Sequence, residues 1–157
     1  MPTKFKSFES LLKPDPRYKN KLVGKFINCL MFGGKKSTAQ KIFYAAMDEV
    51  HKKIADKEPV DIFTTAVNNA KPLIEVRSRR VGGATYQVPV PVPQKRQISL
   101  AYRWILGAAR GKKGRPMHQR LAEELYNCYR GEGESIKKRD DVHKMAEANK
   151  AFAHLAY

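Results

Sequence analysis

Hydrophobic residues recur at steps of three and four along most of the chain, which is the period of one face of an α-helix. Five stretches show this pattern clearly. They run from Leu22 to Met31, Ile42 to Ile54, Ile62 to Ala70, Ile98 to Ala109 and Met117 to Cys128. Ser37 or Thr38 is suited to cap the second helix, and Ser135 is suited to cap a sixth helix that runs to about Ala153. The pattern therefore predicts six helices.

Between the third and fourth helices the period changes to two. Residues 73–81 and 84–92 are rich in β-branched residues and flank Gly82 and Gly83, which predicts a β-hairpin. Three prolines of one parity occupy the second strand and its end, and their missing amide hydrogens would all lie on the outer edge of an antiparallel ribbon. They are Pro89, Pro91 and Pro93. The predicted ribbon therefore keeps the hydrogen bonds between its two strands, while the prolines remove amide donors from its outer edge.

The predicted fold is mainly α, a bundle of about six helices with one protruding two-stranded antiparallel β-hairpin at about residues 73–92. A chain of 157 residues suits a single domain, which we expect to span residues 18–157. Residues 1–17 show no sustained period and end in Pro14-Asp15-Pro16. We expect them to form an extended basic arm that becomes ordered only against a partner.

Positive charge is concentrated in the middle of the chain. The protein has 31 Lys and Arg against 15 Asp and Glu, a formal net charge of +16. Residues 71–115 carry 11 of the basic side chains and one acidic side chain, Glu75, while residues 116–157 carry 7 of each. With 42% hydrophobic residues the chain can bury a core, so this charge predicts a folded protein that binds a polyanion.

The hairpin and the loop at 111–115 carry the most informative cations. Arg77 and Arg79 project to one face of the ribbon and Arg80 to the other, and unpaired charges are rarely buried. We therefore expect the tip to enter a nucleic-acid groove, with Tyr86 opposite Arg79 and able to stack on it or on a base. The glycines of the flexible loop would let its cations approach phosphates closely.

The sequence disfavours nucleotide binding, metal binding and a membrane span. The segment GGKKST at 33–38 is not a nucleotide-binding loop, because Cys29 stands where that motif requires glycine. Its lysines still suit a backbone phosphate at a helix N-terminus, or form a solvated cap. No motif predicts a metal or a cofactor, no apolar run could span a membrane, and two well-separated cysteines favour a reducing cytoplasm. A ribonuclease that uses His118 or His143 remains an alternative.

Five segments of the chain resemble the bacterial-type family of small-subunit ribosomal protein seven, in that family's order and spacing. They are LKPDPRY at 12–18, GKKST at 34–38, VRSRRVGGATYQVPV at 76–90, RLAEEL at 120–125 and KKRDDVHKMAEANKAFAH at 137–154. The resemblance covers the chain from about residue 12 to its end. It implies six helices with a protruding hairpin, no catalytic activity, and a place in the small subunit of a cytoplasmic ribosome, or of one encoded by an organelle.

The resemblance further implies a primary rRNA-binding protein that nucleates assembly of the subunit head. The helical body would hold the 3′ major domain of the rRNA, next to ribosomal proteins nine and eleven, and the hairpin would lie near the exit-site tRNA and the mRNA path. A free regulator that binds its own mRNA could use the same surface. The residues expected to contact rRNA are Lys35, Lys36, Arg77, Lys95, Arg96, Arg103, Arg110, Lys112, Lys113 and Arg115. Those expected near tRNA and mRNA are Arg79, Arg80, Gly82, Gly83 and Tyr86.

Overall fold

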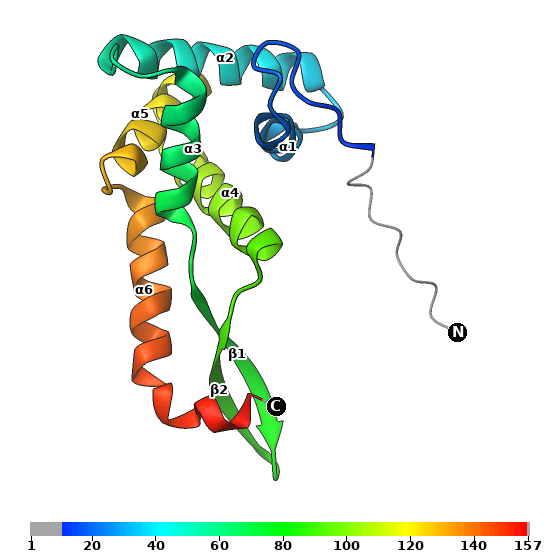
Figure 1. The fold of residues 1–157 in the computed structure, drawn as a ribbon, viewed down its shortest axis with the longest axis vertical. Helices are drawn as coiled ribbons and strands as arrows, with labels where there is room; N and C mark the ends of the chain where they lie inside the picture. Colours follow the sequence, from blue (N-terminus) through cyan, green and yellow to red (C-terminus); the bar gives the residue numbers. More distant parts are fainter. Residues whose placement is uncertain (1–10, 157) are drawn as a thin grey trace.

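The computed structural model describes residues 11–156, in which most of the helices gather at one end of an elongated molecule, while a β-hairpin and the last α-helix extend side by side toward the other (Figure 1). The α-helices are α1 (Lys21–Leu30), α2 (Lys36–Lys53), α3 (Pro59–Ala70), α4 (Gln94–Gly111), α5 (Met117–Tyr129) and α6 (Glu134–Ala148). The strands are β1 (Ile74–Val81) and β2 (Ala84–Pro91), and a short 3₁₀-helix, η2 (Lys150–Leu155), follows α6. The predicted fold class is confirmed.

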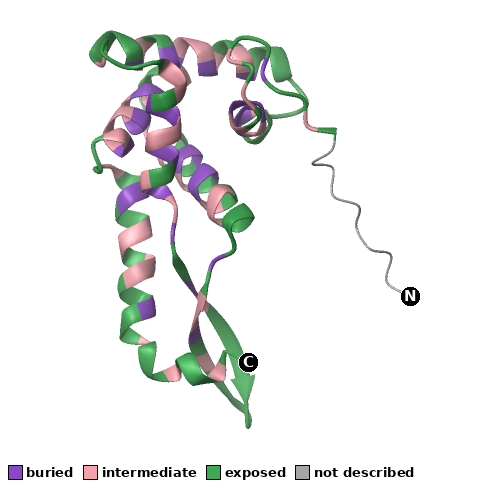
Figure 2. Ribbon diagram, viewed as in Figure 1, coloured by how far each residue is buried: buried purple, intermediate pink, exposed green. Residues whose placement is uncertain are grey.

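Four aromatic rings form the centre of the helical end. Phe26 of α1, Phe43 of α2, Phe63 of α3 and Tyr102 of α4 are all buried, and their ring centroids lie 5.1 to 6.4 Å apart. Most of these pairs meet edge to face, the arrangement that aromatic quadrupoles favour. The Tyr102 hydroxyl donates to the carbonyl of Leu22 at 3.0 Å, so its polar atom is satisfied inside the core. Figure 2 shows that the buried residues concentrate here.

The segment before α1 is attached to the helical body, which corrects part of the prediction for residues 1–17. Asp15 is only 3% exposed, and its carboxylate accepts hydrogen bonds from the amides of Arg17 and Tyr18 and from the hydroxyl of Tyr44. Arg17 also forms an ion pair with Asp48 at 2.6 Å. Residues 11–17 are therefore held against α2 by the protein itself. The rest of the predicted arm, residues 1–10, lies outside the described residues.

The hairpin has the predicted register. Arg79 pairs with Tyr86 and Val76 with Pro89, and the turn residues Gly82 and Gly83 both have positive φ, as a type I′ turn requires. The amide of Val92 donates to the carbonyl of Leu73 at 3.0 Å. Even-numbered amides of this strand therefore face β1, so the proline positions of odd parity face outward as predicted.

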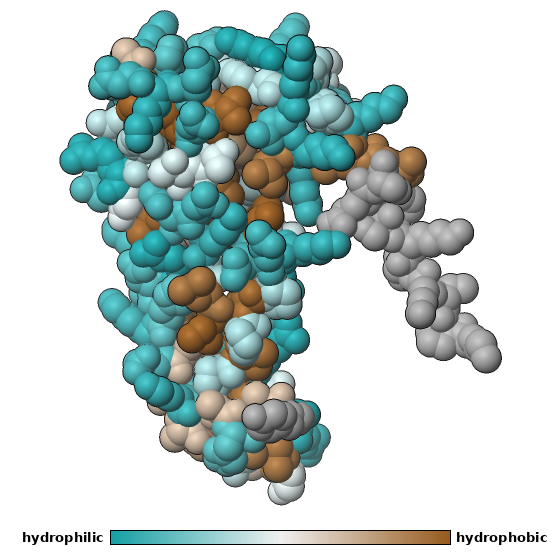
Figure 3. All heavy atoms as spheres, in the orientation of Figure 1, coloured by the Kyte–Doolittle hydropathy of each residue, from teal (hydrophilic) through white to brown (hydrophobic). Residues whose placement is uncertain are grey.

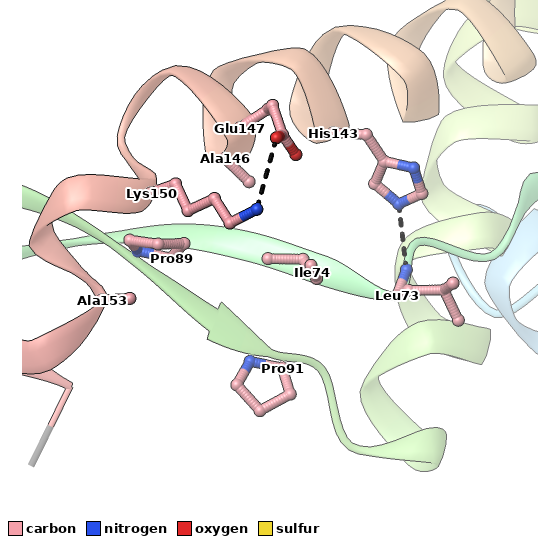
Figure 4. A pocket seen from close by; sticks show the side chains of 9 residues that line it. All are labelled: Leu73, Ile74, Pro89, Pro91, His143, Ala146, Glu147, Lys150 and Ala153. Atoms are coloured by element: carbon pink, nitrogen blue, oxygen red, sulfur yellow. Dashed lines mark hydrogen bonds and ion pairs between the residues drawn. The ribbon is translucent and has the colours of Figure 1, made fainter.

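The base of the hairpin does not stand alone. Figure 4 shows Ile74 and Pro89 facing His143 and Ala146 of α6, and the Nε2 atom of His143 accepts a hydrogen bond from the amide of Leu73 at 3.1 Å. On η2, the ring of Phe152 lies 5.3 Å from that of Tyr86. These contacts stabilise a two-stranded ribbon that would be marginal in isolation.

The sixth predicted helix is shorter than expected and begins differently. α6 ends at Ala148, and the chain continues as η2 rather than as one helix to Ala153. Ser135 does not cap α6, because the N-cap residue is Gly133 with φ of +111° and Ser135 lies buried inside the first turn. Similarly, α2 begins at Lys36 without a capping side chain, so neither Ser37 nor Thr38 has the predicted role.

Candidate nucleic-acid interface

The predicted cationic residues fall into two groups that lie at opposite ends of the molecule (Figure 1). One group belongs to the helical end, at the start of α2, along α4 and in the α4–α5 connection. The other belongs to β1 and the hairpin turn. Lys95 and Arg96 lie between them, in the first turn of α4, which follows directly from β2. The structure thus divides what the sequence presents as one central basic block.

The exposed side of α4 forms the middle of the helical group. Arg103 and Gly107 border two shallow grooves, one shared with Cys29 of α1 and Arg110, the other with Lys138 of α6. Apart from its chain neighbours and the backbone of its own helix, no heavy atom lies within 4 Å of the position that a side chain at Gly107 would take, so the helix backbone is open to a close approach there. We call this surface the α4 ridge. Its cations and bare backbone suit a sugar-phosphate chain.

The Cys29 thiol lines the groove between α1 and α4, and nearby cations affect its pKa. Burial raises the pKa of Cys29, while the charges of Lys25, Arg103 and Arg110 act to lower it. Two of these cations, Arg103 and Arg110, border the groove, and none of the described residues that line it is a carboxylate. A groove with this field attracts an anion.

The turn between α1 and α2 adjoins the α4 ridge. Arg110 donates from Nη2 to the carbonyl of Leu30, the last residue of α1, at 3.2 Å. The turn that follows exposes Lys35 and Lys36 to solvent. Arg110 is thus attached to the end of α1, and Lys35 and Lys36 follow in the turn that continues from it.

The α4–α5 connection is held in place by α5, which corrects the expectation of a flexible link. The Nη1 atom of Arg120 donates to the carbonyls of Arg110 and Lys112. Lys112 lies 3.5 Å from Glu123 and 3.6 Å from Glu124, measured from its Nζ to a carboxylate oxygen of each. Arg115 pairs with Glu123 at 3.7 Å, so two of the predicted RNA ligands already have protein partners. Lys113 is exposed and carries no ion pair to any residue of 11–156.

Glu124 is the residue of this region that the sequence prediction missed. Its carboxylate is completely buried and accepts hydrogen bonds from the amide of Ser135 at 3.0 Å, from the Ser135 hydroxyl at 2.5 Å and from the Cys128 thiol at 3.7 Å. Burial raises the pKa of Cys128 to about 12, so this thiol stays protonated. Glu124 thus joins α5, the start of α6 and, through Lys112, the basic connection. The sequence feature that could have predicted its burial is its position on the apolar face of α5, three residues after Leu121.

Glu75 is the buried carboxylate that joins elements at the hairpin, as Glu124 does at the helical end. It is buried and bound by Arg77 at 2.7 Å and by Arg96 at 2.8 Å. Burial raises the pKa of the Glu75 carboxyl, but the hydrogen bonds from Arg96 and Arg77 outweigh it and the net pKa is lowered. Two more predicted RNA ligands therefore have a carboxylate partner, and one of them, Arg96, fastens the hairpin to α4. The sequence identified Glu75 as the single acidic residue of 71–115, but it did not predict the ion pairs with Arg77 and Arg96.

The tip of the hairpin carries the remaining predicted residues. Arg79 donates to the carbonyl of Leu155, and Tyr86 lies against Phe152, so η2 engages both. Arg80, Gly82 and Gly83 are exposed, and no heavy atom lies within 4 Å of a side-chain position at either glycine. The open part of the tip is therefore smaller than predicted and centres on Arg80 and the turn.

The two histidines of the ribonuclease alternative have partners within the protein. His118 lies 3.3 Å from Glu49, and His143 accepts from the backbone amide of Leu73. Within residues 11–156 no group of three or more His, Cys, Asp or Glu side chains could hold a metal ion. No helix in that same range has the length and apolar character needed to cross a membrane.

One exposed hydrophobic surface lies where the hairpin leaves the helical body. Figure 3 shows hydrophilic side chains over most of this face, with hydrophobic ones both at the helical end and nearer the hairpin. A pocket of about 430 Å³ lies between the hairpin base and α6. Leu73 and Ile74, which border it, are 66% and 41% exposed. This surface is suited to a protein contact rather than to RNA.

Comparison with known proteins shows what the chain is similar to. Residues 2–150 match the family model described as ribosomal protein S7p/S5e. The small ribosomal subunit protein uS7 of Rhodopirellula baltica is 55% identical over 152 residues, which cover 96% of this chain and 97% of the relative. The protein of the same name from Thermotoga petrophila is 57% identical over 144 residues and 92% of each chain, and that from Pseudothermotoga lettingae is 54% identical over 146 residues, 93% of this chain and 94% of the relative.

Proposed function

We propose a specific position and role in the ribosome for this chain, starting from the fact that it belongs to the ribosomal protein S7p/S5e family. As a member, it is a structural, non-enzymatic component of the small ribosomal subunit and associates with small-subunit rRNA. The proposal is that it is a primary rRNA-binding protein of the 3′ major domain and nucleates assembly of the subunit head. The two free thiols suit the cytoplasmic location that the proposal includes.

The observation that carries the proposal is the set of cations at the helical end that the protein does not neutralise itself. No acidic side chain of residues 11–156 forms an ion pair with these residues. They are Lys35, Lys36, Arg103, Arg110 and Lys113. They lie on or beside the α4 ridge, where a phosphate backbone would replace the missing counter-charges and release bound ions. Recognition then depends on the fixed spacing of these cations and on the folded shape of the RNA.

The hairpin has a separate role in the proposal. Arg80, Gly82 and Gly83 lie at the end of the molecule far from the α4 ridge (Figure 1). We place this tip near the exit-site tRNA and the mRNA path. The base of the hairpin is fastened to α4 through Glu75, so the tip is supported as an arm that can reach beyond the rRNA-bound body.

Protein neighbours resembling ribosomal proteins nine and eleven are also part of the proposal. The exposed Leu73 and Ile74 beside the pocket between the hairpin base and α6 support a protein neighbour on that side. An apolar surface of this kind gains little from a phosphate backbone but is stabilised by contact with another protein.

The experiment measures binding of the full chain to a transcript of the 3′ major domain as a function of salt. Arg103→Ala/Arg110→Ala should weaken binding and reduce the slope of log affinity against log salt by roughly 1.4 to 1.8, as expected for two lost phosphate contacts. The matched control is Lys137→Ala/Lys150→Ala, which removes the same charge from two exposed lysines that pair with Glu134 and Glu147. Equal slopes for both double variants would refute the proposed interface.

A further inference from the structure

Phe32 is an exposed aromatic residue that neither the core nor the charge argument explains. Its side chain is 87% exposed, more than any other large hydrophobic residue of the described chain. It lies in the connection between α1 and α2, directly before Gly33 and Gly34. Burial of this ring against a partner would provide a favourable free energy that the isolated protein does not gain.

The backbone around Phe32 is well defined. Gly33 and Gly34 have φ of +58° and +74°, and the amide of Lys35 donates to the carbonyl of Phe32 at 3.2 Å, which closes a tight turn with Phe32 as its first residue. On the preceding side, the amide of Met31 donates to Ile27 at 2.9 Å and ends α1. The ring is therefore carried on a closed turn that begins where a helix ends.

The outer side of this turn is open. No heavy atom lies within 4 Å of the position that a side chain would take at Gly33 or at Gly34. The two glycines therefore serve the backbone conformation and leave room beside the aromatic ring. A flat ligand could reach the ring without displacing protein atoms.

Cations lie close to Phe32 in the chain and at the end of the helix that precedes it. Lys35 and Lys36 follow the turn and are exposed, and Arg110 is bound to the carbonyl of Leu30, two residues before Phe32. None of the three forms an ion pair with a carboxylate in residues 11–156. An aromatic face between cations is the combination with which proteins hold unpaired nucleotides, because the ring stacks on a base while the cations bind the flanking phosphates.

We propose that Phe32 is a stacking site for an unpaired base of the small-subunit rRNA, with Lys35, Lys36 and Arg110 on the adjacent phosphates. This inference rests on the proposed function and adds a base contact to an interface otherwise built from phosphate contacts. A protein partner fits the surroundings less well. The residues that follow the ring are two glycines and two lysines, which provide no contiguous apolar surface for a protein side.

The test uses the full chain and a transcript of the 3′ major domain of the rRNA. Phe32→Ala should reduce affinity about 5- to 100-fold at every salt concentration and leave the salt slope unchanged, because a stacking contact releases no counterions. Phe32→Tyr and Phe32→Trp should retain affinity, whereas Phe32→Leu should behave like Phe32→Ala. Chemical probing should show one unpaired nucleotide that the wild type protects and Phe32→Ala does not.

Lys35→Ala/Lys36→Ala provides the comparison that separates this inference from the proposed function. It should reduce the salt slope by roughly 1.4 to 1.8. If the wild type binds and this variant loses slope while Phe32→Ala binds normally, stacking is refuted and the proposed function stands. If Phe32→Ala binds RNA normally but fails to recruit a neighbouring ribosomal protein during subunit reconstitution, the site belongs to a protein and the inference is also refuted. If the wild type itself does not bind, the proposed function fails. Because Phe32 is exposed, the melting temperature of each variant should match the wild type.

Discussion

Replacing Glu124 with alanine should destabilise the protein far more than replacing its neighbour Glu123. Glu124 is completely buried and is a hydrogen-bond acceptor for Ser135 and Cys128, with the Lys112 ammonium 3.6 Å away. Its removal leaves the amide of Ser135 unpaired in the interior, takes one acceptor from the Ser135 hydroxyl and removes one of the two carboxylates near Lys112. A buried donor that loses its acceptor costs about 1 to 3 kcal/mol.

The expected loss can be measured by thermal or urea unfolding. For a chain of this size, each kcal/mol corresponds to about 2 to 4 °C, so Glu124→Ala should lower the melting temperature by roughly 2 to 12 °C. Glu124→Gln retains an acceptor for Ser135 but loses the charge, and its effect should lie between those of the wild type and Glu124→Ala. The urea m-value should stay unchanged if the variants still unfold in one step.

Glu123→Ala is the matched control, because it removes the same charge one residue away. Glu123 is 40% exposed and pairs with Lys112 at 3.5 Å and with Arg115 at 3.7 Å. Partly exposed ion pairs contribute at most about 1 kcal/mol. If both variants cost less than about 1 kcal/mol, or cost the same, the reasoning that Glu124 organises the start of α6 and the basic connection is refuted.

Two further predictions concern the segment before α1 and the hairpin tip. Burial and the hydrogen bond to Asp15 raise the pKa of Tyr44 from 10.0 to about 12, so the folded state holds this proton more tightly than the unfolded chain, and stability is lost as the pH rises from about 10 toward 12. Asp15→Ala should lower this pKa, measured by ultraviolet titration, and should reduce stability at neutral pH, whereas Asp48→Ala should leave the pKa of Tyr44 in place. Arg80→Ala should leave affinity for the 3′ major domain unchanged but weaken retention of exit-site tRNA in reconstituted subunits. Equal loss of rRNA affinity in Arg80→Ala and Arg103→Ala would contradict the division between body and tip.

The positions of the elements and most of the core were within reach of the sequence. The three-and-four spacing placed Phe26, Phe43, Phe63 and Tyr102 on buried faces, and all four meet in the structure. Paired glycines between two β-branched runs were enough for the hairpin register. These features depend on local backbone geometry and on the period of burial, and both are written in neighbouring residues.

Contacts between elements could not be predicted from the sequence. Asp15 is held by Tyr44, which lies 29 residues further along the chain, and Glu75 is held by Arg96 at a separation of 21. The sequence likewise predicted which residues are cationic but not which of them are neutralised. Arg77, Arg96, Lys112 and Arg115 carry the same charge as Arg103, yet each has a carboxylate partner within the protein.

Periodicity and composition by themselves determined that this chain is a helical, basic protein with one hairpin, because local spacing specifies which face of an element is buried. Only the tertiary structure decided which of the described cations have a carboxylate partner within the protein. A charge is neutralised by whatever lies within a few ångströms of it, and that distance is set by how helices far apart in the chain pack together.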